Sequence, residues 1–231
     1  MRSARPRRAS ANVPRRPSAS ARRQTPFMPP HRDIAAFHER AQRYEDGWLG
    51  RLHREIADRT VTLALAEAAV PAMRVLDVGC GTGYLLRRLA DRCPETAVLA
   101  GVDPAPTMIE LAETTSCDER MRFSIGVAEH LPYPEDAFDL VVSTTSFDHW
   151  SDQAAGLVEC ARVMRPGGRL VLVDQFSAWL TPTLLVRRGK ARTKRRATRL
   201  LVAAGFRSPE WHDLYAVIIR AATATRSLPR R

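Results

Sequence analysis

The sequence predicts an α/β fold: a seven-stranded, mostly parallel sheet with an antiparallel last strand, helices on both faces and an amino-terminal helical cap. Apolar runs alternate with amphipathic segments through residues 71–222, as in parallel strands joined by helices of roughly 10 to 15 residues. The last two apolar runs have no helix between them, so we expect them to pair antiparallel. Glycines at positions 79, 81 and 83 follow the first strand, in a turn that suits the ligand-binding edge of a parallel sheet.

The elements follow one another in a regular order. Residues 31–70 carry apolar side chains at helical spacing, and Pro71 closes that segment. Pro106 suits the first turn of a helix, Gly205 suits the end of one, and the Arg-Pro-Gly-Gly sequence at 165–168 predicts a turn. The predicted strands are 73–78, 97–102, 121–126, 138–143, 169–174, 207–213 and 215–222, and the later helices are 82–92, 106–115, 152–164 and 191–204.

The chain of 231 residues is long enough for one sizeable α/β domain, which we place at 71–222 behind the cap at 31–70. Residues 1–30 have little to bury and predict a disordered basic tail, although an organellar transit peptide or a later start at Met28 would fit as well. Residues 223–231 are expected to form a carboxyl-terminal tail. No apolar run approaches the roughly 18 residues of a membrane span, so we expect a cytoplasmic protein.

The net charge of +11 is concentrated in two segments. Residues 1–32 hold nine Arg, residues 187–199 hold eight Lys or Arg, and neither segment has an acid, so the rest of the chain is net negative. The second segment has three interpretations: a solvated helix face, a subsite for an acidic acceptor or membrane surface, or a nucleic-acid contact. The first is the default, and nucleic acid is not favoured because the charge does not cover one uniform face.

Two carboxylates make the glycine turn more informative. Nucleotide, flavin and nicotinamide folds all use similar glycines, so the turn alone does not identify a ligand. Asp77 ends the first strand two residues before Gly79, and Asp103 ends the second strand. An acid about 20 residues beyond such a turn is placed to accept hydrogen bonds from ribose hydroxyls. The alternative for Asp103 is an ordinary aspartate in a surface turn.

Four motifs in this order resemble the class I S-adenosylmethionine-dependent methyltransferases, which have a Rossmann-like fold. The resemblance covers about residues 44–222 and is strongest to the subgroup that includes the ubiquinone and menaquinone C-methyltransferases. It implies S-adenosylmethionine as cofactor and S-adenosylhomocysteine as product. The motifs are residues 75–83, 101–103, 128–139 and 162–170.

The resemblance also implies a role for particular residues. The turn backbone would hold the methionine part of the cofactor, with Asp77 near its amino group and Asp103 on the ribose. An aromatic residue of the cap would cover the cofactor, with Tyr44 the best match and Trp48 the next. The remaining implied cofactor contacts are Gly79, Cys80, Gly81 and Gly83 in the turn, Pro104, Met108, Ala128 and Glu129 around the adenine, and Ser143 and Thr144 beside the methionine part.

Methyl transfer from a sulfonium mainly requires alignment, and a general base only when the acceptor is an alcohol, a phenol or an acidic carbon. Asp148 and His149 follow the fourth strand and are the candidates, although His149 could instead fix its loop. We expect a small-molecule acceptor, oxygen before carbon or nitrogen. The alternatives are a nucleic-acid methyltransferase and a non-catalytic S-adenosylmethionine-binding protein. The cysteines (Cys80, Cys93, Cys117 and Cys160) lack metal-ligand spacing, so no metal site is expected.

Overall fold

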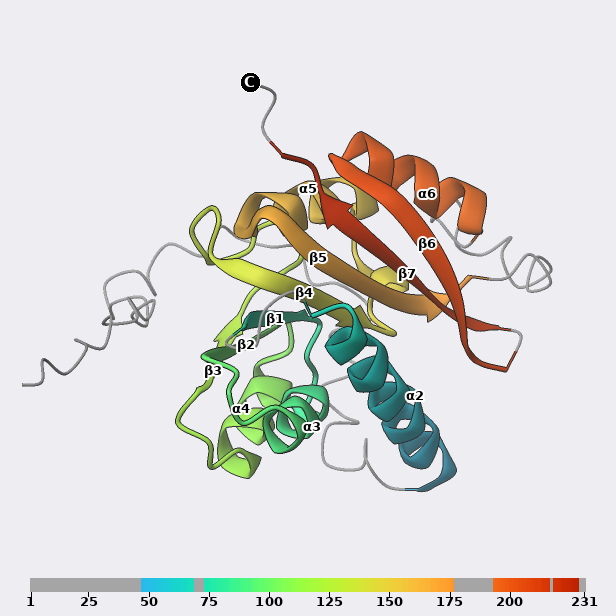
Figure 1. Cartoon of the computed structure of the whole chain (residues 1–231). Helices are drawn as coiled ribbons and strands as arrows, with labels where there is room; N and C mark the ends of the chain where they lie inside the picture. The colour runs from blue at the N-terminus through green and yellow to red at the C-terminus, as the bar shows by residue number, and fades with distance from the viewer. Residues whose placement is uncertain (1–46, 69–72, 177–192, 217, 229–231) are drawn as a thin grey trace, which may run out of the picture. The chain divides into compact units, whose positions relative to one another are not determined.

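The computed structural model describes residues 47–68, 73–176, 193–216 and 218–228, which form alternating strands and helices (Figure 1). The first half contains α2 (Gly47–Ala66), β1 (Arg74–Val78), α3 (Tyr84–Arg92), β2 (Val98–Asp103), α4 (Pro106–Thr115) and β3 (Met121–Ile125). The second half contains β4 (Phe138–Thr144), the short 3-10 helix η3 (Phe147–His149), α5 (Gln153–Val163), β5 (Met164–Gln175), α6 (Lys194–Ala203), β6 (Phe206–Tyr215) and β7 (Ile219–Arg226). Within these residues no helix is both long and apolar enough to cross a membrane.

The strands form one seven-stranded sheet in the order β3-β2-β1-β4-β5-β7-β6. Strands β1 to β5 pair in parallel, whereas β7 pairs antiparallel with both β5 and β6. This arrangement confirms the predicted fold class. The chain proceeds outward from β1 in one direction and from β4 in the other, so the strand order reverses between these two neighbours. Ligands of open α/β sheets bind at the carboxyl ends of the strands at such a reversal.

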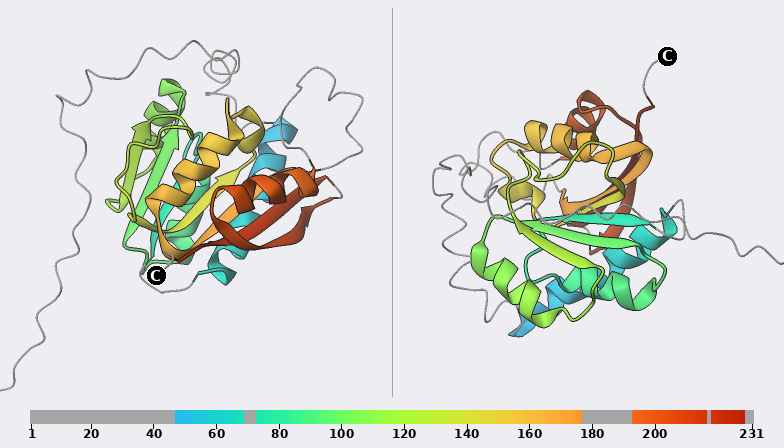
Figure 2. Two further views of the ribbon diagram at one scale, coloured as in Figure 1. Left: turned by 90° about the horizontal axis from the view of Figure 1, so that it is seen from above. Right: turned by 90° about the vertical axis from the view of Figure 1, so that its left-hand side faces the viewer.

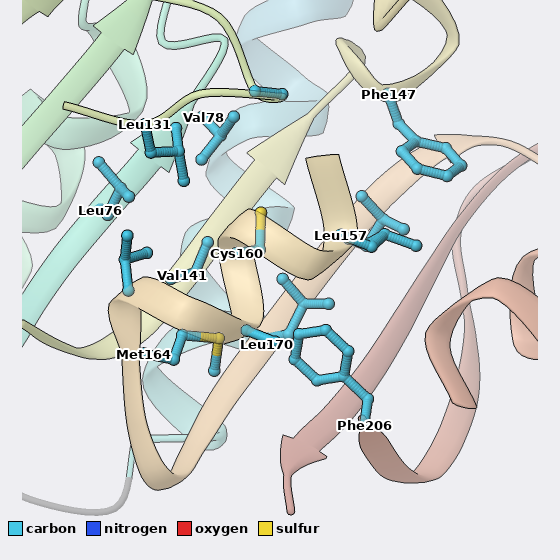
Figure 3. Packing of buried hydrophobic residues seen from close by; sticks show 14 of the residues in the cluster. Leu76, Val78, Leu131, Val141, Phe147, Leu157, Cys160, Met164, Leu170 and Phe206 are labelled. Atoms are coloured by element: carbon cyan, nitrogen blue, oxygen red, sulfur yellow. The ribbon is translucent and has the colours of Figure 1, made fainter. Parts of the chain in front are cut away.

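Helices cover both faces of the sheet, with α2, α3 and α4 on one side and α5 and α6 on the other (Figures 1 and 2). On the α5 and α6 side, Leu157 and Cys160 of α5 pack with Leu170 of β5 and Phe206 of β6 in one buried cluster (Figure 3). On the opposite side, α2 and α3 bury Ile56, Val61, Leu86 and Leu89 against the sheet. The central strands are therefore apolar on both faces, which explains why they appear in the sequence as continuous apolar runs.

Strands β5 and β7 extend beyond their predicted bounds. Strand β5 begins at Met164 rather than 169, because Met164 pairs with Phe138 and the pairing then shifts register across the predicted turn. Strand β7 ends at Arg226, so the predicted strand end at 222 was wrong: Phe206 of β6 pairs with Arg226 and holds residues 223–226 in the sheet. The domain bounds 71–222 stay a prediction. In the predicted cap 31–70, the described helix is α2, and residues 31–46, like the predicted tail 1–30, lie outside the described residues.

Helix α5 approaches its preceding loop closely enough to require glycine at position 156. A Cβ atom there would lie 2.4 Å from Cε3 of Trp150 and 2.8 Å from Cζ3. Alanine normally favours a helix over glycine by about 1 kcal/mol, but overpacking of a tight core costs about 1–3 kcal/mol. We therefore expect Gly156→Ala to lower the free energy of unfolding, measured by urea denaturation. In a Trp150→Leu background the same change should be neutral or stabilising. A stabilising effect in the wild-type background would contradict this packing.

Candidate functional site

A pocket opens where the carboxyl ends of β1 and β4 meet helix α2. The non-atom space in it, including the open solvent at its mouth, is about 560 Å³. Predicted site residues that line it are Asp77, Gly79, Cys80, Gly81 and Thr144. The other lining residues are Gly50, His53, Arg54 and Ala57 of α2, Thr82, Tyr84 and Leu85 at the start of α3, and Thr145. The sheet reversal thus coincides with a pocket, as the topology requires.

The glycine turn is held tightly on one side and open on the other. The N–H groups of Gly79 and Cys80 both donate to the carbonyl of Val102 in β2, at 2.8 and 3.1 Å. A Cβ at Gly79 would lie 2.3 Å from Oγ of Ser146, so a side chain there is excluded by packing. Gly81 also has a positive φ of 52°, but a Cβ there would meet nothing within 4 Å. Its backbone therefore borders open space in the pocket.

The third glycine has a different role from the first two. Gly83 has a φ of 77° at the start of α3, and a Cβ there would lie 2.8 Å from Cζ of Phe123. It lets α3 pack closely against β3 and is not among the residues that line the pocket. The predicted contact of Gly83 with the cofactor stays a prediction, and its packing role alone accounts for the glycine.

Asp103 holds the glycine turn in place through a hydrogen bond to Gly81. Its Oδ2 accepts a hydrogen bond from the Gly81 N–H at 3.0 Å, and its Oδ1 accepts one from the Ala105 N–H at 2.9 Å. Burial raises the pKa of this carboxyl, and the two backbone hydrogen bonds partly oppose that shift. Asp103 is half-buried and is not among the residues that line the pocket, so its predicted ribose contact stays a prediction. The alternative of a simple surface-turn aspartate does not account for the bond to Gly81.

Asp77 is the most perturbed carboxyl group of the pocket. Burial, together with the nearby charge of Asp103, raises its pKa from the ordinary 3.8 to about 8. Its Oδ1 is buried and has no hydrogen-bond partner among the described residues, and the same is true of Oγ1 of Thr144. Buried polar atoms without partners are rare in proteins, and two of them lining one pocket indicate a ligand with hydrogen-bond donors. An ammonium group has this chemistry.

The end of β4 is tied to β1 by hydroxyl groups. Oγ of Ser146 donates to the carbonyl of Val78 at 2.8 Å, and it also lies 2.8 Å from Oγ of Ser143. The indole N–H of Trp150 donates to Oγ of Ser146 at 3.2 Å. Ser143 is fully buried in this network, so it lies behind Thr144 rather than in the pocket.

The other predicted residues lie around the pocket rather than in its lining. Met108 is only 2% exposed within the packing of α4, and Pro104 is half-buried. Ala128 is buried near Gly156, and Oε1 of Glu129 accepts a hydrogen bond from the Asp152 N–H at 2.8 Å, at the start of α5. Among the described residues, no group of three or more His, Cys, Asp and Glu side chains could hold a metal ion.

Helix α2 places no Phe, Tyr or Trp side chain of its described residues in the pocket lining. Tyr44 lies outside the described residues, and Trp48 is 66% exposed and absent from the pocket lining. Helix α2 instead presents a face of Gly50, His53, Arg54 and Ala57, which the sequence reasoning missed. Their spacing of i, i+3, i+4 and i+7 is the signal that could have identified them, because it places a His-Arg pair between two small residues on one helix face.

The predicted catalytic pair lies beside the pocket, over the end of β5. The N–H of Asp148 donates to Oδ2 of Asp174 at 3.0 Å, and the N–H of Gln175 donates to Oδ1 at 2.6 Å. Asp174 is 5% exposed, and its pKa is raised chiefly by burial and further by Asp148, whereas the nearby His149 lowers it. The sequence reasoning also missed Asp174, although an acid ending a run of buried apolar residues was visible in the sequence.

Comparison with known proteins agrees with this fold. The family described as "Methyltransferase domain" matches residues 76–172, from β1 into β5. The chain is 41% identical over 114 residues to a demethylmenaquinone methyltransferase of Deinococcus radiodurans, a match that covers 48% of this chain and 47% of the relative. It is 35% identical over 193 residues to a malonyl-[acyl-carrier protein] O-methyltransferase of Geobacter sulfurreducens, covering 77% of this chain and 71% of the relative.

Solved structures show the same fold at lower identity. A putative methyltransferase in complex with the Haloferax volcanii Trm112 methyltransferase activator has a TM-score of 0.72 and 20% identity, and covers 87% of this chain and 100% of that chain. A SAM-dependent methyltransferase of Aquifex aeolicus has a TM-score of 0.65 and 19% identity, covering 81% and 97%. The chain spans about half the length of the Deinococcus relative but more than two thirds of the Geobacter one.

These matches place the chain in the class I S-adenosylmethionine-dependent methyltransferases. The predicted resemblance, enzyme class and cofactor are thereby confirmed. The pocket fits this cofactor, because it combines an open glycine backbone with buried carboxylate and hydroxyl oxygens that lack partners in the described structure.

The raised pKa of Asp77 has a consequence for stability. Between about pH 4 and pH 8 the folded carboxyl keeps its proton and the unfolded one loses it, so the ligand-free protein loses stability as the pH rises. We expect Asp77→Asn to remove this loss, so that its stability advantage over wild type grows from pH 4 to pH 8 in urea titrations. Asp118→Asn is the control: Arg120 lowers the pKa of Asp118 from its ordinary 3.8, so the effect of this change varies mainly below about pH 4 and should stay nearly constant up to pH 8. An advantage for Asp77→Asn that does not change with pH would contradict the shift.

Proposed function

We propose that this methyltransferase acts on a small-molecule acceptor, with an oxygen nucleophile favoured over carbon or nitrogen. The observation that carries the proposal is the buried Asp174 beneath η3, which places a carboxylate next to His149 at the carboxyl edge of the sheet. The two relatives are named for malonyl-[acyl-carrier protein] and for demethylmenaquinone, so neither name refers to a nucleic acid. We also infer a cytoplasmic location, which stays a prediction.

The pocket residues supply alignment and exclusion of water. Asp77 and Thr144 would hold the amino group of the cofactor, the turn backbone from Gly79 to Gly81 would follow its methionine part, and Asp103 would hold the ribose. When bound, S-adenosylmethionine supplies an electrophilic methyl group whose leaving group departs uncharged, so the protein needs no general acid. Rigid placement of the reactants is then the main source of rate.

His149 would accept the proton of the acceptor hydroxyl. It ends η3 beside β5, and its charge partly opposes the raised pKa of Asp174, so the two side chains interact electrostatically. Asp174 is therefore a positioning residue, and the hydrogen bond from the Asp148 N–H fixes η3 over it. The alternative is that His149 only fixes its loop.

The pH dependence of turnover separates these two roles. We expect His149→Ala to lower kcat by about 10²- to 10⁴-fold at neutral pH, the usual contribution of a general base. The loss should shrink as the pH rises and the acceptor ionises by itself. Asp174→Asn should keep the fold and shift the acidic limb of the kcat profile. Unchanged turnover of His149→Ala across pH 6–9 with the true acceptor would leave His149 with only a structural role.

The choice of acceptor class is tested by methyl release from labelled cofactor. Methylation of members of a metabolite panel, with none of mixed RNA or DNA, is the expected result. Arg195, Arg196 and Arg199 lie exposed on α6, so a triple change to Gln should leave turnover of a small acceptor within about twofold, as is usual for surface substitutions. Methylation of nucleic acid that this triple change abolishes would favour the nucleic-acid alternative. Cofactor binding without transfer to any acceptor would favour the non-catalytic one.

A further inference from the structure

We propose that Arg54 of α2 binds the carboxylate of the cofactor's methionine part, so that α2 and β1 together recognise both charges of an amino-acid head group. The proposal rests on S-adenosylmethionine being the cofactor of this pocket. It assigns α2 a role in selecting the cofactor, in addition to covering the sheet.

The pocket offers buried oxygen atoms on one wall and a cationic group on the opposite wall. On the sheet side Asp77 and Thr144 present buried oxygens that lack partners in the described structure, and on the α2 side Arg54 lines the same space. An α-amino acid carries an ammonium and a carboxylate on one carbon atom, so it needs an acceptor and a cationic donor on opposite sides. Guanidinium binds carboxylate through two parallel hydrogen bonds and stays charged at any physiological pH.

The α2 face leaves room for such a ligand. Gly50 and Ala57 lie one turn before and after the His53-Arg54 pair, and both line the pocket. Neither Gly50 nor Ala57 carries a bulky side chain, so Arg54 is the cationic group that this face of α2 contributes to the pocket lining. The positive charge of Arg54 also acts on the nearby Tyr84, whose pKa is raised first by burial and then by Asp58, with Arg88 and Arg54 opposing the rise. Tyr84, the first residue of α3, also lines the pocket. Its interaction with Arg54 therefore places Arg54 near the α3 side of the pocket.

Helix α2 contacts neighbouring elements on both sides, and these contacts fix the position of the Arg54 backbone. Nε of Arg88 on α3 lies 2.7 Å from Oδ1 of Asp58 on α2. On the other side, Nη1 of Arg59 donates to the carbonyl of Leu214 at 2.9 Å, and its guanidinium lies 5.1 Å from the centre of the Tyr215 ring. A preorganised cationic group loses less entropy on binding than one on a mobile segment.

Calorimetric binding of three ligands tests the proposal without any acceptor. S-adenosylhomocysteine has both charged groups, decarboxylated S-adenosylmethionine keeps the ammonium but has no carboxylate, and methylthioadenosine has neither. We expect Arg54→Gln to weaken S-adenosylhomocysteine binding about 10- to 100-fold, as for a hydrogen bond to a charged group, and the decarboxylated ligand by less than about threefold. Arg54→Lys should restore part of the loss, because it keeps the charge without the paired hydrogen bonds.

Matched variants make each failure distinct. Arg51→Gln, an exposed change on the same helix outside the pocket lining, should leave all three affinities unchanged. Asp77→Asn should weaken both ammonium-bearing ligands and spare methylthioadenosine. Equal losses of the two ammonium-bearing ligands in Arg54→Gln, or a selective loss in His53→Gln instead, would overturn the assignment to Arg54. Wild-type protein that binds none of the ligands would overturn the cofactor site itself.

Discussion

A carboxylate buried at the end of a central strand is the constraint on which the rest of this site depends. Removing an ionised carboxylate from water costs several kcal/mol unless a partner offsets it, and Asp77 responds by holding its proton up to about pH 8. Its flanking strand residues, Leu76 and Val78, are fully packed and cannot provide that partner. The ligand-free protein therefore keeps an unfavourable group at the sheet reversal, and a cationic ligand would relieve the cost. Instability of this kind is typical of sites shaped for binding rather than for folding.

The surrounding packing keeps this unfavourable arrangement in place. Ser146 bonds the carbonyl of Val78 and fills the space where a side chain at position 79 would lie, so β4 sets the position of the glycine turn. Asp103 bonds Gly81 from the opposite side, so β2 sets it as well. The turn is thus defined by two strands that flank β1, and its open face is left to the ligand. A parallel sheet achieves this because its strand ends converge at one edge.

The part of the site that sequence reasoning identified is the part encoded locally. Asp77, Gly79 and Gly81 follow directly from one strand, and Asp103 from the next; spacing predicted the role of Asp103, and the resemblance to class I methyltransferases implied the roles of the other three. Arg54 and Asp174 were missed because they reach this region only through tertiary packing, one from a helix before the sheet and one from the end of β5. The same distinction applies to the fold: the parallel pairing followed from the alternation of strands and helices, whereas the early start of β5 and the late end of β7 depend on pairing partners distant in sequence.

The strand order also divides the site into a pocket half and a half that holds the proposed general base. The pocket lies on the β1 side of the reversal, where the glycine turn, Asp77 and α2 converge, and His149 and Asp174 lie on the β4 and β5 side. The first half is built from residues tied to one another by backbone hydrogen bonds, so substitutions there disturb several contacts at once. The second half rests on a buried aspartate that bonds the backbone N–H groups of Asp148 and Gln175, a scaffold that does not depend on the side chains above it.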